Sequence, residues 1–210
     1  GRAHDGYYLA HPALLDGVFQ LVGALEAQAA TTHLGTSSSW DGREAPFQPI
    51  RVGDESRWNL LLSESTTRYL AGHRVGTTSL IPATAYIEML LPCIRELDSS
   101  VESVKLFDMQ FFSILYLRDP TRPPTIVIEL TGDCFTITTD ATVHATLRWE
   151  RIASQARVLD VDAVKARCGE TCDAVTFYGS TGNDYKGEFA KAKTIHIGEQ
   201  EMLVEIEFED

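Results

Sequence analysis

Two short segments combine residues that can move protons with residues that begin a helix. One holds His73 nine residues before Pro82, and the other, residues 11–16, ends in Asp16 with Gln20 one helical turn later. A neutral imidazole can take up a proton at physiological pH. A carboxyl group that burial keeps protonated can give one up. Together the two segments predict an acid/base site in a water-poor tunnel.

Residues 12–30 are predicted to form a buried helix around Asp16. Pro12 suits a first helical turn, and the following residues are apolar except for Asp16 and Gln20. These two lie four residues apart and share a helix face, so Gln20 can orient the acid. A buried carboxyl group must either find donors or stay protonated. Taken alone, Asp16 can also be a core aspartate that caps a neighbouring loop.

His73 is predicted to lie on a strand, within residues 69–75, ahead of a helix that Pro82 opens. The first amides of that helix, with the backbone of Gly76 and Thr77, can bind a carbonyl oxygen that gains negative charge. Taken alone, a single histidine is more often a structural hydrogen-bonding residue. Its assignment as a base therefore depends on the rest of the pattern.

The elements around these segments predict an α+β chain in which an antiparallel sheet wraps a helix. After the helix at Pro82, which Pro92 should kink or end early, the strand candidates are residues 104–117, 125–130, 134–138 and 142–149. Further elements are expected as a strand near 47–52, a helical piece at 161–167 and a strand over 194–208. Alternating apolar residues from 202 to 208 predict one buried face for the last strand.

Composition restricts the class of protein. The chain has 210 residues, of which 44% are hydrophobic and 23% charged, and these values are ordinary for a soluble globular protein. A net charge of −12 argues against nucleic acid as a partner. No apolar run approaches the roughly 20 residues of a membrane span. The four cysteines and six histidines show no metal-ligand spacing, so we expect free thiols in the cytoplasm and no metal site.

The motifs together resemble the dehydratase domain of polyketide synthases and animal fatty acid synthases, which has a double-hotdog fold. The family's aspartate motif, HPxLLDxxxQ or H, is matched by residues 11–20 at every defining position. Its histidine motif, HxxxGxxxxP, is matched by His73 and Pro82 at the correct separation. A third segment, residues 182–189 around Tyr185, is similar to the family's Gly-x-x-Tyr-Gly-x-x-Phe.

The resemblance implies removal of water from a β-hydroxyacyl thioester carried on an acyl carrier protein. His73 would act as the general base and protonated Asp16 as the general acid, with Gln20 and Tyr185 orienting the acid or the substrate. The further substrate-binding positions would be Gly76, Thr77 and Pro82. The resemblance implies no metal or redox cofactor, because the phosphopantetheine arm belongs to the carrier protein. It also implies neighbouring synthase domains and a homodimer as partners.

The sequence departs from the family in two residues of the histidine segment, in the glycine of the Tyr185 segment, which is shifted by one place, and in its order. Thr77 stands where the histidine motif has glycine, and Gly72 replaces the usual acidic neighbour of the histidine, a change expected to matter little. The aspartate helix here precedes the histidine segment, so we interpret the chain as circularly permuted with a shortened second hotdog. The predicted divisions are 1–52 for the aspartate-helix part and loop, 53–153 for the histidine hotdog and 154–210 for a linker and returning strands.

Two other functions stay open at this point. The Thr77 departure and the shortened second hotdog favour a non-catalytic, dehydratase-like scaffold or dimerisation domain, whereas the His73 and Asp16 pair argues against it. A dehydratase-like isomerase or cyclase would share that pair. Motifs therefore do not separate it from a dehydratase, and product analysis would.

Overall fold

The computed structural model describes residues 29–33 by their backbone and then residues 47–119, 121–153, 160–181, 185–199 and 201–206. Most of the predicted helix over residues 12–30, with Asp16 and Gln20, lies outside these ranges. Its predicted end is wrong, because Ala29 and Ala30 belong to a strand. Across the described ranges, no helix combines the length and apolar character needed to cross a lipid bilayer.

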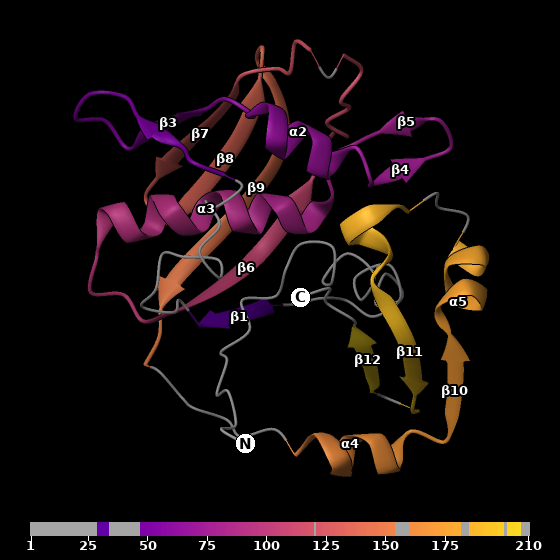
Figure 1. Cartoon of the computed structure of the whole chain (residues 1–210). Helices are drawn as coiled ribbons and strands as arrows, with labels where there is room; N and C mark the ends of the chain where they lie inside the picture. The colour runs from indigo at the N-terminus through magenta and orange to yellow at the C-terminus, as the bar shows by residue number, and fades with distance from the viewer. Residues whose placement is uncertain are drawn as a thin grey trace, which may run out of the picture.

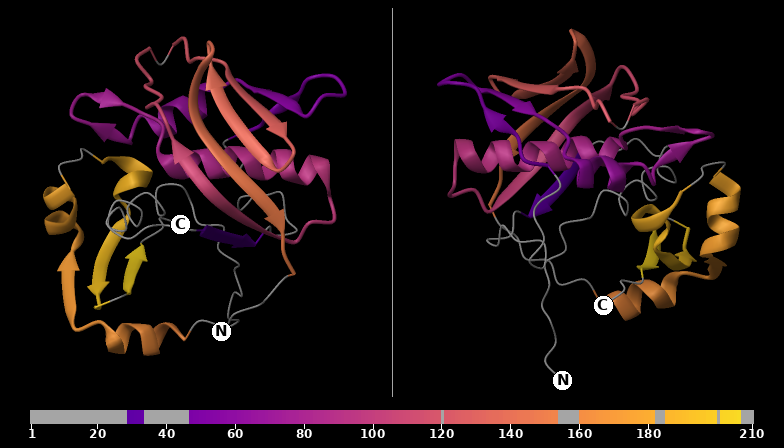
Figure 2. Two further views of the ribbon diagram at one scale, coloured as in Figure 1. Left: turned by 180° about the vertical axis from the view of Figure 1, so that it is seen from behind. Right: turned by 45° about the horizontal axis from the view of Figure 1, so that its top comes forward.

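An antiparallel sheet of seven strands wraps around one long helix, as Figures 1 and 2 show. In spatial order the strands are β1 (Ala29–His33), β6 (Ser103–Phe111), β9 (Thr142–Arg151), β8 (Cys134–Thr139), β7 (Ile126–Thr131), β3 (Arg57–Leu60) and β2 (Ile50–Arg51). The helix, α3 (Ala83–Leu97), lies across one face of this sheet. The predicted α+β arrangement, with a sheet wrapped around a helix, is confirmed.

The main hydrophobic core fills the space between α3 and the sheet. The fully buried helix residues are Ala85, Met89, Leu90, Cys93 and Ile94. The fully buried sheet residues include Trp58, Leu106, Ile126, Ile128, Phe135, Ile137, Ala145 and Leu147. In β7 and β8 these residues alternate with more exposed ones, as expected for strands that cover the core with one face.

The helix α3 continues through Pro92 to Leu97, so the early end predicted from Pro92 is not found. A proline inside a helix costs about 3 kcal/mol. Cys93 and Ile94, which follow it, are both fully buried in the core. Because burying one large apolar side chain contributes about 1.5–3 kcal/mol, packing of this turn against the sheet outweighs the lost hydrogen bond.

The four strands predicted after α3 correspond to β6, β7, β8 and β9, but β6 ends at Phe111 rather than at residue 117. The chain leaves the sheet there and pairs with the residues that precede α3. The amide of Ile81 donates to the Leu115 carbonyl at 2.9 Å, and the amide of Leu117 donates to the Ser79 carbonyl at 2.9 Å. Segment 112–117 is therefore part of the support for the start of α3.

Between β3 and α3 the chain forms a short helix and a hairpin: α2 (Glu64–Leu70), β4 (Arg74–Val75) and β5 (Thr78–Ser79). The strand predicted over residues 69–75 is therefore largely wrong. Ser63 caps α2 by accepting from the Thr66 amide at 3.0 Å, and this capping starts a helix that runs to Leu70. Only the last two residues of the predicted strand lie in β4.

The remaining described residues form a smaller unit beside the first sheet (Figure 1). Its elements are α4 (Val161–Arg167), β10 (Glu170–Asp173), α5 (Ala174–Thr181), η1 (Gly187–Ala190), β11 (Ala192–Ile197) and β12 (Met202–Ile206). The strand predicted over residues 194–208 is instead a hairpin, in which the Gly198 amide donates to the Glu201 carbonyl at 2.8 Å. All residues of β12 are half-buried, so the predicted single buried face is wrong.

Replacing Trp58 by phenylalanine is expected to lower the free energy of unfolding by about 2–3 kcal/mol, because it removes buried ring atoms and a hydrogen bond. The indole of Trp58 is fully buried and donates to Glu96 Oε2 at 2.8 Å. Denaturant titration would measure the loss. Trp149→Phe is the matched control, since Trp149 is half-buried against the same Phe135 ring. An equal loss in the control would contradict the role of the bond.

Candidate functional site

His73 lies in the tight turn between α2 and β4. The His73 amide donates to the Leu70 carbonyl at 3.0 Å, and the Gly72 amide donates to the Tyr69 carbonyl at 3.1 Å, so the turn follows directly from the end of the helix. The turn brings the His73 side chain inside, where it is only 3% exposed. A histidine at such a position is held in one orientation and is largely removed from bulk water.

The hydrogen bond of the imidazole identifies which ring nitrogen carries the proton. Nδ1 of His73 lies 3.0 Å from the Leu80 carbonyl oxygen. A carbonyl oxygen can only accept, so Nδ1 donates. In the neutral ring the lone pair is then on Nε2, the nitrogen that can act as a base.

The Leu80 carbonyl is held in place from both sides. The Leu80 amide donates back to the His73 carbonyl at 3.2 Å. Leu80 also forms an isolated antiparallel bridge with Tyr116, and the next amide, of Ile81, is bound by Leu115. The acceptor for the imidazole is therefore fixed by segment 112–117 rather than by a flexible loop.

A second buried histidine, His144, anchors that segment. His144 is 4% exposed, and its Nδ1 donates to the Ser113 carbonyl at 3.0 Å. Its Nε2 lies 2.7 Å from the Thr139 hydroxyl and accepts from it in the neutral ring. His144 is a residue that sequence reasoning missed, because nothing in the local pattern around it distinguishes it from any other strand residue.

Aromatic residues from the smaller unit pack against the His73 ring. Tyr185 is stacked on the imidazole, with ring centroids 5.1 Å apart and ring planes at 27°. Phe189 lies 5.2 Å from the imidazole centroid and 5.0 Å from that of Tyr69. The structure thus brings predicted residue Tyr185 to His73 across more than 100 positions of sequence. Phe189 was not among the predicted site residues, although the motif around Tyr185 contained it.

The other predicted positions in this half of the site lie between His73 and α3. Gly76 and Thr77 form the exposed two-residue turn of the β4–β5 hairpin. Gly76 has φ +59°, and nothing lies within 4 Å of a Cβ added to it, so this glycine serves the turn geometry rather than a close approach. Pro82 is the N-cap of α3 and offers no side-chain acceptor to its first amides. Asp16 and Gln20 lie outside the described residues.

One buried carboxyl group on α3 was not singled out from the sequence. Both carboxylate oxygens of Glu88 are buried, and neither has a hydrogen-bond partner among the described residues. Burial without a compensating donor raises the pKa of Glu88 to about 8. Glutamate is a common helix former, so the helical pattern gives no sign of this burial.

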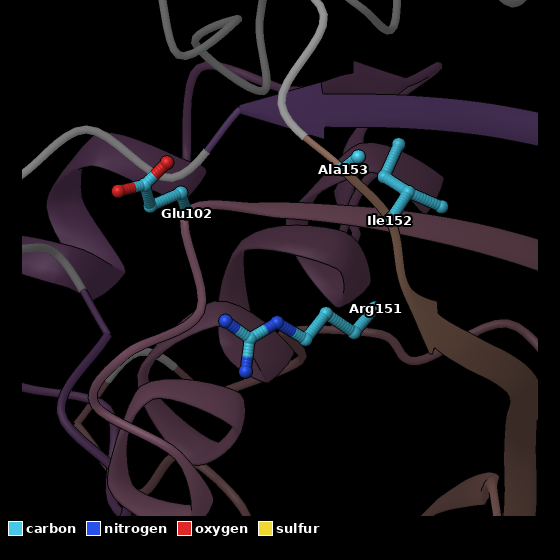
Figure 3. A pocket seen from close by; sticks show the side chains of 4 residues that line it. All are labelled: Glu102, Arg151, Ile152 and Ala153. Atoms are coloured by element: carbon cyan, nitrogen blue, oxygen red, sulfur yellow. The ribbon is translucent and has the colours of Figure 1, made fainter.

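A surface pocket of about 440 Å³ is lined by Glu102, Arg151, Ile152 and Ala153 (Figure 3). Arg151 is already paired, since it lies 3.0 Å from the Asp98 carboxylate. None of the four residues belongs to the aromatic cluster around His73. The pocket is therefore separate from the candidate site.

Comparison with known proteins shows the relation of this fold to others. Residues 48–146 match the family model described as the polyketide synthase dehydratase domain. A search of curated proteins found no match. Among solved structures, a dehydratase domain of a trans-AT polyketide synthase from Brevibacillus brevis has a TM-score of 0.64 at 19% sequence identity. The alignment covers 76% of this chain and 62% of that one.

Two dehydratases of the curacin polyketide synthase are similar as well. The domain from the CurF module has a TM-score of 0.64 at 22% identity, covering 78% of this chain and 66% of that one. An inactive mutant of the CurK dehydratase, with phenylalanine in place of a histidine, has a TM-score of 0.59 at 20% identity, covering 77% and 62%. The chain thus spans less than two thirds of the length of these domains, and at these identities the likeness shows the fold.

Proposed function

Because residues 48–146 match the model of the polyketide synthase dehydratase domain, we propose that this chain removes water from a β-hydroxyacyl thioester carried on an acyl carrier protein. The product is an α,β-enoyl thioester. The observation that carries the proposal is the state of His73. It is buried, its Nδ1 donates to Leu80, and its Nε2 is the basic nitrogen of the neutral ring.

In the proposed reaction, Nε2 of His73 takes the proton from the α-carbon, which the thioester carbonyl makes removable. The bond from the β-carbon to its hydroxyl breaks, and the electron pair of the former C–H bond forms the double bond. Protonated Asp16 gives its proton to the departing hydroxyl, which leaves as water. Gln20 and Tyr185 orient these groups.

The thioester oxygen gains negative charge as the α-proton leaves, and amide donors near the start of α3 are proposed to stabilise it. Pro82 caps this helix without a side-chain acceptor. The positive end of the helix dipole also favours negative charge at this place. Gly76 and Thr77 belong to the hairpin that leads into this helix, and we assign their backbone to the same role.

A comparison with the CurK dehydratase supports the choice of base. One of its mutants, with a histidine replaced by phenylalanine, is described as inactive, and so is another with an aspartate replaced by asparagine. Both residue types are those proposed here. The pairing of His73 with Asp16 requires the second half of a double hotdog. We propose that residues 1–52 and 154–210 supply it, in circularly permuted order and with a shortened second hotdog.

The proposal is tested by incubating the chain with a β-hydroxyacyl thioester of a short carrier-arm mimic and following the enoyl product by mass spectrometry. Loss of one water from the substrate is the expected result. A shifted double bond or a cyclised product would instead support a dehydratase-like isomerase or cyclase. No conversion of any β-hydroxyacyl thioester, on the mimic or on an acyl carrier protein, would contradict catalysis.

A non-catalytic scaffold or dimerisation domain is the second candidate, and a specific observation favours it. The large apolar side chains of Phe111, Phe112, Ile114 and Val143 are more than a third exposed. Such exposure is typical of surfaces that contact another protein. This function would be favoured if the chain converts no thioester and analytical ultracentrifugation shows that it forms a dimer.

A further inference from the structure

Gly72, the residue before His73, touches the segment that carries the aromatic residues of the site. The Lys186 amide donates to the Gly72 carbonyl at 2.9 Å. A Cβ added to Gly72 would lie 2.3 Å from the Lys186 carbonyl oxygen and 3.2 Å from Cδ2 of Phe189. The closer of these contacts is with backbone, which cannot rotate away as a side chain can.

Among the glycines of the described ranges, Gly72 is the one at which an added Cβ would overlap a neighbouring atom. Gly53, Gly76, Gly132 and Gly187 have positive φ angles and nothing within 4 Å of an added Cβ. Gly72 shows the opposite combination, with an ordinary φ and a blocked Cβ position. Glycine is therefore needed here because the backbone of Lys186 approaches closely, and not because the backbone of Gly72 has an unusual conformation.

The close approach determines how the aromatic residues reach the imidazole. Lys186 follows Tyr185 directly and precedes Phe189 by three residues, and both rings contact His73. A Cβ at residue 72 needs roughly 1 Å more room than the 2.3 Å available to reach an ordinary contact distance. That displacement would move the stacked Tyr185 ring away from His73.

We propose that Gly72 is a positioning residue, whose missing side chain lets the Tyr185–Phe189 segment lie against His73 and hold its ring. The kinetic consequence rests on the proposed function, in which His73 is the base. The family has an acidic residue at this position, and the sequence alone indicated that the exchange matters little. The backbone contact shows that, in this chain, the glycine is required.

The first measurement needs no variant. Nuclear Overhauser contacts between the His73 ring protons and those of Tyr185 and Phe189 are expected in the full chain. The His73 signals are assigned by through-bond correlation of the ring protons with the His73 backbone. Absence of these contacts in the wild-type chain would overturn the proposal, whether or not any variant folds.

The second measurement compares Gly72→Ala with Gly169→Ala. Gly169 has an ordinary φ and nothing within 4 Å of an added Cβ, so it is the matched control. We expect Gly72→Ala to shift the His73 ring signals and weaken the contacts to Tyr185, and Gly169→Ala to leave both unchanged. Unaltered His73 signals in Gly72→Ala, or equal changes in the control, would overturn the proposal.

Kinetics separate this inference from the proposed function. In a chain that dehydrates the thioester, Gly72→Ala is expected to lower kcat by about 10- to 100-fold with little change in KM, because a misplacement of about 1 Å can cost that much. In a chain that already carries Tyr185→Leu, Gly72→Ala should lower kcat only slightly further. If Gly72→Ala alters the ring contacts but the wild-type chain never dehydrates the thioester, the positioning role of Gly72 stands and the proposed function is wrong.

Discussion

His73→Ala is expected to lower turnover of a β-hydroxyacyl thioester by about 10²- to 10⁴-fold, the usual contribution of a general base. The expectation follows from the hydrogen bond between Nδ1 and Leu80, which leaves Nε2 as the basic nitrogen. Steady-state kinetics of enoyl formation would measure the loss. Circular dichroism would check that the fold survives.

The matched control is His196→Ala. His196 is also buried, at 5% exposure, and its Nε2 lies 3.2 Å from Glu205 Oε1 in the smaller sheet. Both variants lose a buried, hydrogen-bonded imidazole, but only one is proposed to meet the substrate. Near-normal turnover is expected for His196→Ala. Full activity in His73→Ala, or an equal loss in both variants, would contradict the assignment of the base.

Asp16→Ala belongs to the same test. The mechanism needs an acid as well as a base, so Asp16→Ala is expected to lower turnover by a factor similar to that of His73→Ala. Its effect should not add to that of His73→Ala, because the two groups act in one elimination. An additive loss would indicate that Asp16 acts on stability rather than on the leaving hydroxyl.

The position of His73 ahead of a helix was predictable from sequence, and its surroundings were not. The spacing of His73 and Pro82 predicted a histidine ahead of a helix, and α3 begins directly after Pro82. The strand predicted over residues 69–75 is instead the end of α2, a turn and two residues of β4, because the Ser63 cap starts a helix that runs to Leu70. A cap depends on one side chain and is easily overlooked beside a run of residues that favour a strand.

Contacts between distant segments are the part that pattern reasoning misses. Strands β7, β8 and β9 follow from alternation of apolar residues, a property of each strand alone. The contact of Gly72 with Lys186 involves residues more than 100 positions apart and shows only when both segments are placed. The hydrogen bond from His144 to the Ser113 carbonyl also joins two separate segments of the chain. Sequence reasoning therefore singled out His73 and Tyr185 and missed the contacts that hold the His73 turn in place.

Glu88→Gln is expected to stabilise the fold at alkaline pH and to change it little at acid pH. Burial raises the pKa of Glu88 from 4.5 to about 8 in the folded chain. Between these two values the folded state holds a proton that the unfolded state has lost. Stability therefore falls as pH rises through this range, by at most about 1.4 kcal/mol per pH unit. Below pH 4.5 both states are protonated and the penalty vanishes.

Glutamine has nearly the same shape as glutamic acid and never ionises, so the variant should lose this part of the pH dependence. We expect its unfolding free energy to exceed that of the wild-type chain by a few kcal/mol near pH 8.5 and to agree within about 1 kcal/mol at pH 5. Denaturant titrations at the two pH values measure the difference. Glu102→Gln, at an exposed position, is the control and should leave it near zero. A pH-independent difference for Glu88→Gln over this range would mean that burial does not raise the pKa of Glu88 in the folded chain.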